Sequence, residues 1–129
     1  MALREDNLIA KVPPHSLEGE ESLLGSLLID KDAIVKVADN LMPSDFYKDS
    51  HKEIYEAIKD LYANQDPIDI ITVSNRLEEK KKLVQAGGRT YLAQLSNTVA
   101  TSGNIVYYAN IIQRKATLRR LQQAAAEIS

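Results

Sequence analysis

Residues 104–129 read NIVYYANIIQRKATLRRLQQAAAEIS, and this stretch contains neither proline nor glycine. Its first half carries apolar side chains at the spacing of one α-helical face, namely Ile105, Tyr108, Ala109 and Ile112. We therefore expect a long helix that begins near Asn104 and has no stop signal up to Ser129. Its first half should dock on the helices that precede it.

The second half of this stretch predicts an interface. Its apolar residues are spaced alternately three and four apart, like the seam of a coiled coil: Leu118, Leu121, Ala125 and Ile128. In one interpretation this seam packs on the first helix of the same chain. We favour the other, in which a helix from a missing segment or a second subunit covers it.

The same helix carries a basic cluster with no acid among its members: Arg114, Lys115, Arg119 and Arg120. Such a cluster indicates either a contact with phosphate groups or an acidic partner, or a solvated helix flank, which is the commoner role of charge runs. The chain of 129 residues has a formal net charge of −2. It therefore lacks the basic excess of a dedicated nucleic-acid-binding domain, and we expect weak, nonspecific DNA binding at most.

The segments before this helix also read as helices. Pro13-Pro14 separates an arm, residues 1–14, from a first helix that Ser16 caps. Within that helix, Gly25-Ser26 leaves a flat spot where another helix can approach closely. A second helix, capped by Asp30 or Asp32 and stopped by Pro43, would bury Ile34, Val37, Ala38 and Leu41.

Three further signals place the remaining helices. A capping box formed by Ser50 and Glu53 predicts the start of a third helix. Asp69 predicts the cap of a fourth helix, and Gly87-Gly88 predicts a break before a short fifth one. The sequence thus predicts an all-α fold, a compact bundle of about six helices, with residues 15–100 as a helical globule and 101–129 as the long last helix.

Several kinds of chemistry are missing from the chain. It has no cysteine, and no glycine is followed by lysine, so there is no P-loop to hold nucleotide phosphates. A zinc site would have to draw on His15 and His51, which are far apart, and we expect structural roles for both. We therefore expect no catalytic, cofactor-binding or metal-binding residue in this chain.

The chain also gives no sign of membrane insertion. Residues 90–113 carry no charged side chain, but Asn97-Thr98 and the polar residues 101–104 interrupt this stretch. The first residues offer no apolar core for a secretory signal. We expect a cytoplasmic protein.

Taken in order, the sequence resembles the N-terminal domain of bacterial replicative DNA helicases of the DnaB type. The residues that carry the resemblance are Pro13-Pro14-His15-Ser16-Leu17-Glu18, Glu20, Leu24-Gly25, Asp45-Phe46-Tyr47, His51, Ile54, Pro67-Ile68-Asp69, Thr72, Leu77, Gly87-Gly88, Tyr91-Leu92, Leu95, Asn104-Ile105, Tyr108-Ala109 and Ile112. One departure is Gly19, where the family carries a better helix former. The other is the missing ATPase domain.

The resemblance implies a role in assembly. In that family, the domain is a helical globule followed by a helical hairpin, and the long last helix would be the truncated first arm of that hairpin. Pairs of domains assemble as a trimer-of-dimers collar that recruits primase, and a helicase loader is a further implied partner. DNA is contacted only through the full-length hexamer, and ATP and Mg belong to the missing motor domain. Tyr91 is a further candidate interface residue.

Two other classes of protein remain open from the sequence. A free-standing helical adaptor or helicase-loader-like protein would share the helical pattern, and its reading frame would stop near Ser129. A helical DNA-binding module would bind duplex DNA with a steep dependence on salt.

Overall fold

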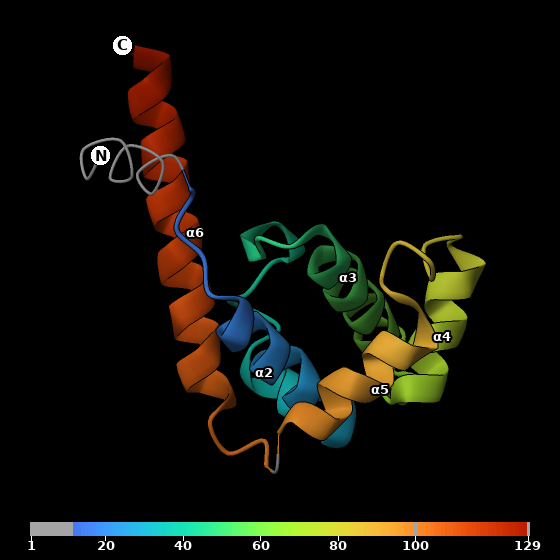
Figure 1. The fold of residues 1–129 in the computed structure, drawn as a ribbon. Helices are drawn as coiled ribbons and strands as arrows, with labels where there is room; N and C mark the ends of the chain where they lie inside the picture. The colour runs from blue at the N-terminus through green and yellow to red at the C-terminus, as the bar shows by residue number, and fades with distance from the viewer. Residues whose placement is uncertain (1–11, 100, 129) are drawn as a thin grey trace.

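The computed structural model describes residues 12–99 and 101–128. Within these residues the elements are five α-helices and two 3₁₀ helices, with no strand (Figure 1): α2 Leu17–Ile29, η1 Ala33–Lys36, η2 Pro43–Asp45, α3 Asp49–Ala63, α4 Ile70–Glu79, α5 Gly88–Thr98 and α6 Ile105–Ile128. The prediction of an all-α fold is confirmed. The predicted count of about six helices is slightly higher than the five α-helices of the described residues, and most of the predicted arm, residues 1–14, lies outside those residues.

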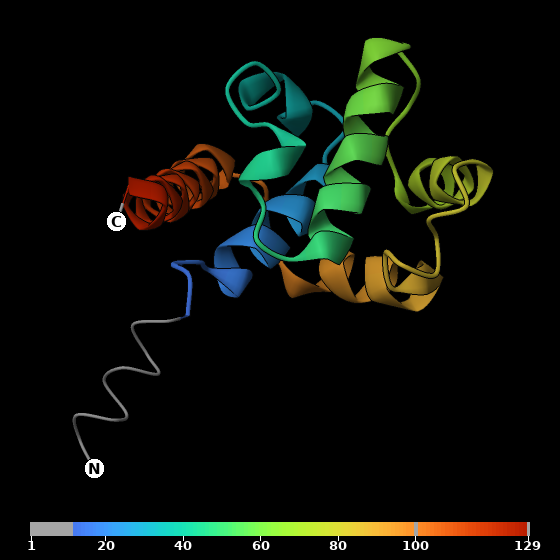
Figure 2. The same ribbon diagram turned by 90° about the horizontal axis from the view of Figure 1, so that it is seen from above.

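Helix α2 lies at the centre of the fold and packs against α5 and α6, while α3 packs against α4 (Figures 1 and 2). Its leucines at 23, 24 and 27 are completely buried. Because the helix is covered on several sides, its apolar residues do not form a single stripe, as they would in a helix with one solvated face.

Gly25 allows the close contact between α2 and α5. A Cβ atom at this position would overlap the backbone carbonyl oxygen of Leu95 in α5. The flat spot predicted at Gly25-Ser26 is therefore confirmed, and α5 is the helix that uses it.

Two of the predicted helix caps are present. The Ser16 hydroxyl accepts the backbone N–H of Gly19 at 3.1 Å at the start of α2. At the start of α4, Asp69 and Thr72 bond each other's backbone N–H groups, both at 2.9 Å. Gly87, with φ of 99°, precedes α5 as predicted.

The second predicted helix is wrong, because its region forms only the four-residue η1. Its apolar residues Ile34, Val37, Ala38 and Leu41 are nevertheless buried, with exposed fractions of at most 4%. Side chains from other elements satisfy the carbonyl groups that follow η1: Lys59 bonds the carbonyl of Ala38, and Tyr55 that of Leu41 at 2.8 Å. A continuous helical ladder is therefore not needed to satisfy this backbone.

The predicted Ser50–Glu53 capping box is also wrong. Helix α3 begins two residues earlier than predicted, at Asp49, with Lys48 in place of Ser50 as its N-cap. The carboxylate of Glu20, from α2, instead accepts the backbone N–H groups of Tyr47 and Lys48 just before the helix. A residue distant in sequence thus takes the place of a local cap, and the Ser50 hydroxyl oxygen is buried without a partner.

Candidate partner interface

The first half of α6 is docked on the body formed by α2–α5. Ile105, Ile112 and Ala116 are each 1% exposed, Ala109 is 5% exposed, and Tyr108 is half-buried against the core. This confirms the prediction that the first apolar stripe of the helix packs on the preceding helices.

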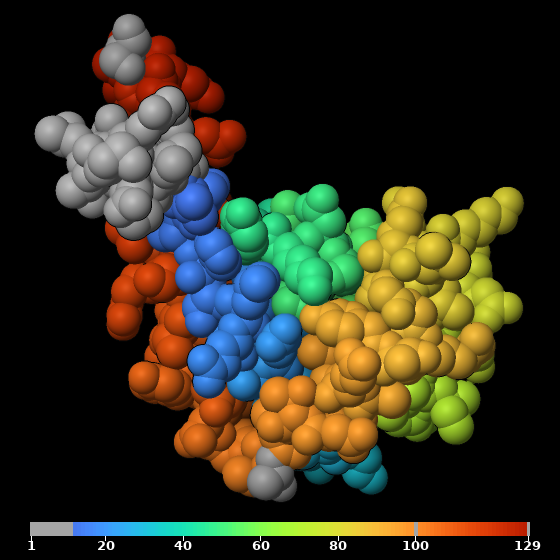
Figure 3. Space-filling view, viewed as in Figure 1, coloured from blue at the N-terminus to red at the C-terminus, as the bar shows by residue number. Residues whose placement is uncertain are grey.

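The predicted seam in the second half of α6 is exposed in the single chain. The exposed fraction is 41% for Leu118, 61% for Leu121 and 87% for Ile128, and Ala125 is also exposed. Figure 3 shows this end of α6 (red) extending beyond the body of the molecule. The structure therefore contradicts the alternative in which the seam packs on the first helix. Ser129 lies outside the described residues.

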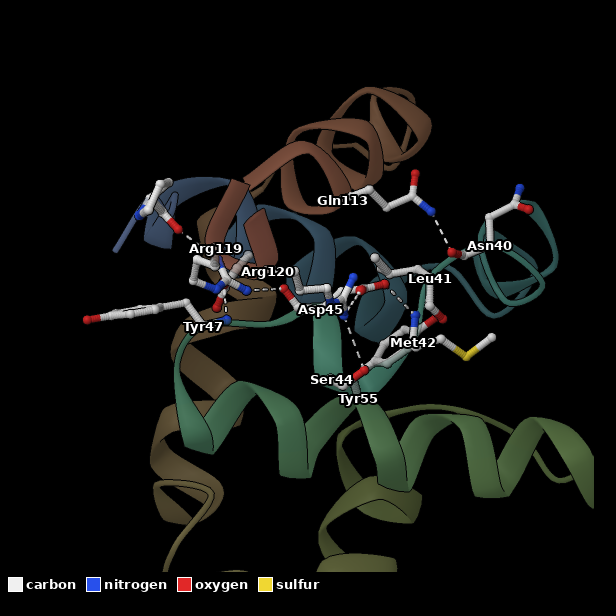
Figure 4. Close-up of polar contacts among 12 residues, drawn as sticks. Asn40, Leu41, Met42, Ser44, Asp45, Tyr47, Tyr55, Gln113, Arg119 and Arg120 are labelled. Carbon is white, nitrogen blue, oxygen red and sulfur yellow. Dashed lines mark hydrogen bonds and ion pairs between the residues drawn. The ribbon is translucent and has the colours of Figure 1, made fainter. Parts of the chain in front are cut away.

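Two arginines connect the exposed half of α6 to the segment around η2 (Figure 4). The guanidinium of Arg120 donates to Oδ1 of Asp45 at 2.6 Å. That of Arg119 donates to the backbone carbonyl oxygens of Asp45 at 2.6 Å and Pro14 at 2.8 Å. We call Arg119, Arg120 and Asp45 the arginine latch.

Asp45 is the centre of the latch because its carboxylate is 7% exposed and has partners on both sides. One oxygen accepts Arg120, and the other accepts the backbone N–H of Met42 at 2.9 Å. Burial, and secondly the charge of Asp45, raise the pKa of the nearby Tyr55 hydroxyl. The latch therefore joins α6 to a part of the core rather than to a loose surface loop.

A cleft of about 520 Å³ lies beside the latch. Its lining includes three cationic side chains, Lys52, Arg119 and Arg120, together with Tyr47, whose ring lies 5.6 Å from the Arg119 guanidinium carbon. Of the other predicted basic residues, Arg114 is exposed and Lys115 is half-buried. Arg119 and Arg120 therefore do more than solvate a flank of the helix, because both form hydrogen bonds with the segment around η2.

Tyr91, the remaining candidate interface residue, ends a chain of buried hydrogen bonds. Its hydroxyl lies 2.6 Å from Nε2 of His51, and Nδ1 of His51 lies 2.7 Å from the Glu20 carboxylate. His51 is completely buried. Glu20 lies in α2, His51 in α3 and Tyr91 in α5, so these two hydrogen bonds connect three helices.

The connectivity of Glu20, His51 and Tyr91 resembles that of a catalytic relay, but its electrostatics oppose that role. Burial, and then the charges of Glu21 and Glu20, raise the pKa of Tyr91 to about 12. An activated nucleophile needs the opposite shift, because its deprotonated form must be accessible. We therefore interpret the three residues as structural, which agrees with the role expected for His51.

His15 also has a packing role. Its ring stacks on that of Tyr47 with 4.0 Å between the ring centroids, and its Nδ1 lies 2.7 Å from the carbonyl oxygen of Pro13. Within residues 12–99 and 101–128, no three His, Cys, Asp or Glu side chains cluster as metal ligands would. In that same part of the chain, no helix is both long and apolar enough to cross a membrane.

Two residues that organise these contacts, Glu20 and Asp45, have no local signal in the sequence. In the sequence, both stand out only among the residues that carry the family resemblance. Both bond groups that are 27 or more residues away in the chain. Because their partners are so distant in the sequence, the burial of these two carboxylates can be inferred only from the fold.

Comparison with known proteins identifies the fold and the family. Residues 12–114 match the family model described as the DnaB-like helicase N-terminal domain. The replicative DNA helicase DnaB of Leifsonia xyli is 42% identical over 125 residues, which are 97% of this chain and 27% of the relative. That of Mycobacterium leprae is 43% identical over 90% of this chain and 19% of the relative. The chain thus spans about a quarter or less of these relatives.

Solved structures agree with this assignment. The N-terminal domain of DnaB helicase from Mycobacterium tuberculosis has a TM-score of 0.88 and 44% identity, over 91% of this chain and 81% of that one. A DnaB-like replicative helicase, described with its interactions with primase, has a TM-score of 0.78 and 26% identity over 88% of this chain and 27% of that one. The chain belongs to the DnaB-like helicase N-terminal domain family.

Proposed function

We propose that this chain is the N-terminal oligomerisation and primase-recruiting domain of a replicative DNA helicase. The exposed seam on the second half of α6 is the observation that carries the proposal. The relatives are replicative helicases, and one similar structure is described with its interactions with primase. In the parent protein, a separate motor domain would use ATP and Mg to unwind DNA in the bacterial cytoplasm.

The geometry of α6 explains why another helix is needed to cover the seam. Successive residues of an α-helix are rotated by about 100°. Leu121 is nine residues after Ile112, and Ala125 is nine residues after Ala116, so the seam lies roughly 180° from the docked stripe. The body that covers the first stripe therefore lies on the wrong side of a straight helix to cover the second.

We infer that the occupant of the seam is a helix of a second copy or of the same parent protein. Pairing through α6, repeated around a ring, would give the dimer and the trimer-of-dimers collar. Fully burying a large apolar side chain contributes about 1.5–3 kcal/mol, so Leu118, Leu121 and Ile128 together offer enough to favour association.

The basic face of α6 supports an acidic protein partner, such as primase or a helicase loader, rather than DNA. Two of its four cations are already bonded to backbone or carboxylate oxygens of the body. The net charge of the chain is −2, which opposes tight DNA binding. We place Tyr91 at a second part of the partner surface.

The main competing proposal is a free-standing helical adaptor or loader-like protein. The exposed seam would suit such a protein as well. The relatives, however, are helicases, and the match covers only 27% of the length of the Leifsonia xyli protein, which favours a domain of a longer helicase. A helical DNA-binding module is the third candidate. Tight, salt-resistant binding of duplex DNA in a fluorescence titration would favour it over the assembly role.

Leu121→Asp tests the proposal. We expect the variant to keep its helical circular dichroism and melting temperature, while sedimentation shows loss of self-association and the full-length helicase forms hexamers less readily. Val35→Asp is a matched control, because Val35 is also 61% exposed but lies on η1. Unfolding of Leu121→Asp would place the seam in the domain's own core. Equal effects of the two variants would contradict a specific interface.

Primase recruitment needs a separate measurement. We expect saturable binding of the primase of the same organism in a fluorescence titration. Leu121→Asp should weaken primase binding only to the extent that it weakens oligomerisation of the helicase. No binding to either the chain or the full-length helicase would refute this part of the proposal.

A further inference from the structure

The guanidinium of Arg119 is held in place, but its charge is not neutralised. Its two hydrogen bonds end on backbone carbonyl oxygens, that of Asp45 at 2.6 Å and that of Pro14 at 2.8 Å (Figure 4). The Asp45 carboxylate pairs with Arg120 instead, and no carboxylate within residues 12–99 and 101–128 forms an ion pair with Arg119. A guanidinium has five N–H donors. Three of those of Arg119, Nε–H among them, therefore remain for a further acceptor.

The cleft of about 520 Å³ beside the latch has an excess of positive charge. Three cations line it, Lys52, Arg119 and Arg120, and no acidic side chain of the described residues does. Asp45 offsets the charge of Arg120. Only Asp49 pairs with Lys52, at 3.5 Å, and an ion pair with a side chain that is 96% exposed contributes little. Arg119 and Lys52 therefore make the cleft suitable for an anion.

An anion in this cleft would meet a guanidinium that is already oriented. Besides its two carbonyl bonds, Arg119 has its guanidinium carbon 5.6 Å from the centre of the Tyr47 ring, within the range of about 6 Å for a cation–π contact. The ring of His15 in turn stacks on Tyr47 with 4.0 Å between the centroids. Since Arg119 has little side-chain freedom left to lose, binding here costs less entropy than at a free surface arginine.

The distribution of charge favours a protein carboxylate over the phosphates of a nucleic acid. Duplex DNA carries one negative charge per about 1.7 Å of its axis and binds where many cations follow it. This cleft offers one guanidinium without a carboxylate partner, and the planar fork of that group matches a single carboxylate. Gln122 and Gln123 also line the cleft, and their amides can both donate to and accept from a peptide backbone.

We propose that this cleft receives a Glu or Asp side chain from an acidic segment of a partner protein, and that Arg119 binds its carboxylate. The inference deepens the proposed function, on which it rests in taking the partner to be a protein. Gln122 and Gln123 of α6 line the cleft together with Tyr47 and Lys52 of the body. The bound segment therefore contacts both α6 and the body.

An NMR titration of the unmodified chain with a tetraglutamate peptide, blocked at both ends, tests the assignment. We expect saturable shifts of the Arg119 Nε–H signal and of the Tyr47 ring signals. A blocked tetraglutamine peptide should cause no saturable shift, and neither should a short DNA duplex at about 0.15 M salt. Equal responses to the two peptides would overturn the proposal. Tighter binding of the duplex at the same signals would replace the protein segment with a nucleic acid.

Arg119→Gln tests which residue binds the carboxylate. The affinity for tetraglutamate should fall by about tenfold or more, the size expected when a charge-assisted hydrogen bond is lost. Arg114→Gln makes the same charge change at an exposed position of α6 outside the lining, and it should lower the affinity by less than about twofold. An equal loss in the two variants would show that affinity follows net charge alone, which would refute the site.

Lys52→Gln is a second variant that leaves every bond of the latch intact. It should weaken tetraglutamate binding severalfold, whereas Lys115→Gln, at another half-buried lysine outside the lining, should change it little. If Arg119→Gln unfolds, this pair of variants decides, and equal affinities in the two would contradict the proposal.

These measurements are independent of the seam, which lies on the opposite face of α6. Leu121→Asp should therefore bind tetraglutamate as the unmodified chain does, and a loss of binding would move the site from the cleft to the seam. A chain that self-associates but does not bind the peptide would refute this inference alone. A chain that binds the peptide but does not self-associate would refute the proposed function alone.

Discussion

Removal of the Asp45 carboxylate should destabilise the domain more than removal of its partner Arg120. Asp45→Ala removes the charged acceptor of two hydrogen bonds, one from the Met42 N–H and one from Arg120, and a hydrogen bond to a charged group contributes about 1.5–3 kcal/mol. The Arg120 side chain is 53% exposed, so water can replace Asp45 and this pair contributes under about 1 kcal/mol. We expect Asp45→Ala to lower the free energy of unfolding by about 2–3 kcal/mol.

Urea unfolding followed by circular dichroism measures these differences, provided that the m-value is the same in each variant. Arg120→Ala should cost about 0.5–1 kcal/mol, and the double variant should reveal a coupling of similar size. Asp45→Asn, which keeps an acceptor for Met42, should lie between Arg120→Ala and Asp45→Ala. If Asp45→Ala were no more destabilising than Arg120→Ala, Asp45 would be an ordinary surface partner and our account of the latch would be wrong.

Three further predictions follow from the fold. Gly25→Ala should lower the free energy of unfolding by about 1–3 kcal/mol, because the added methyl group forces two helices apart. Gly103→Ala, whose Cβ would meet only ordinary contacts, is its control, and equal urea midpoints would contradict the close approach. Asp69→Ala should cost about 1 kcal/mol in the same assay through loss of the capping box, and an unchanged midpoint would contradict this. The Ser102 hydroxyl is the first cause of the lowered pKa of Asp30, with the Asp32 N–H next. A lowered folded-state pKa contributes stability that is complete above the unfolded value of 3.8 and lost as the pH falls through the folded value. Ser102→Ala should therefore be less stable than the unmodified chain at neutral pH, with a difference that narrows below pH 3.8 in acid titrations; a difference that widens in acid would have the wrong sign.

Local signals in the sequence were sufficient where a helix end is determined by its own neighbours. Ser16 and Asp69 cap the helices that they were predicted to cap, and Gly87 precedes α5. The two apolar patterns of α6 also predicted its docked and exposed halves correctly. These features depend on residues within one or two helical turns of each other, which is the range over which spacing carries information.

The errors arose where distant residues satisfy the backbone. Ser50 and Glu53 have the spacing of a capping box, yet Glu20, some thirty residues earlier, bonds the N–H groups that precede α3. The apolar spacing from Ile34 to Leu41 suits a helix, yet Lys59 and Tyr55 bond the carbonyls that follow η1. Both errors are tertiary effects that local patterns cannot register. For the same reason, the Tyr91 network and the latch required the structure.

The latch shows how one helix can both dock and remain open to a partner. The docked positions of α6 are spaced four, three and four residues apart from Ile105 to Ala116. Continuing that register brings the inner face to Arg119 and Arg120, so apolar packing gives way there to hydrogen bonds with the body. Those bonds orient the helix without using the seam on the opposite face. Substitutions in the seam should therefore change assembly, while substitutions at Asp45 should change the stability of the domain and the direction in which α6 presents that seam.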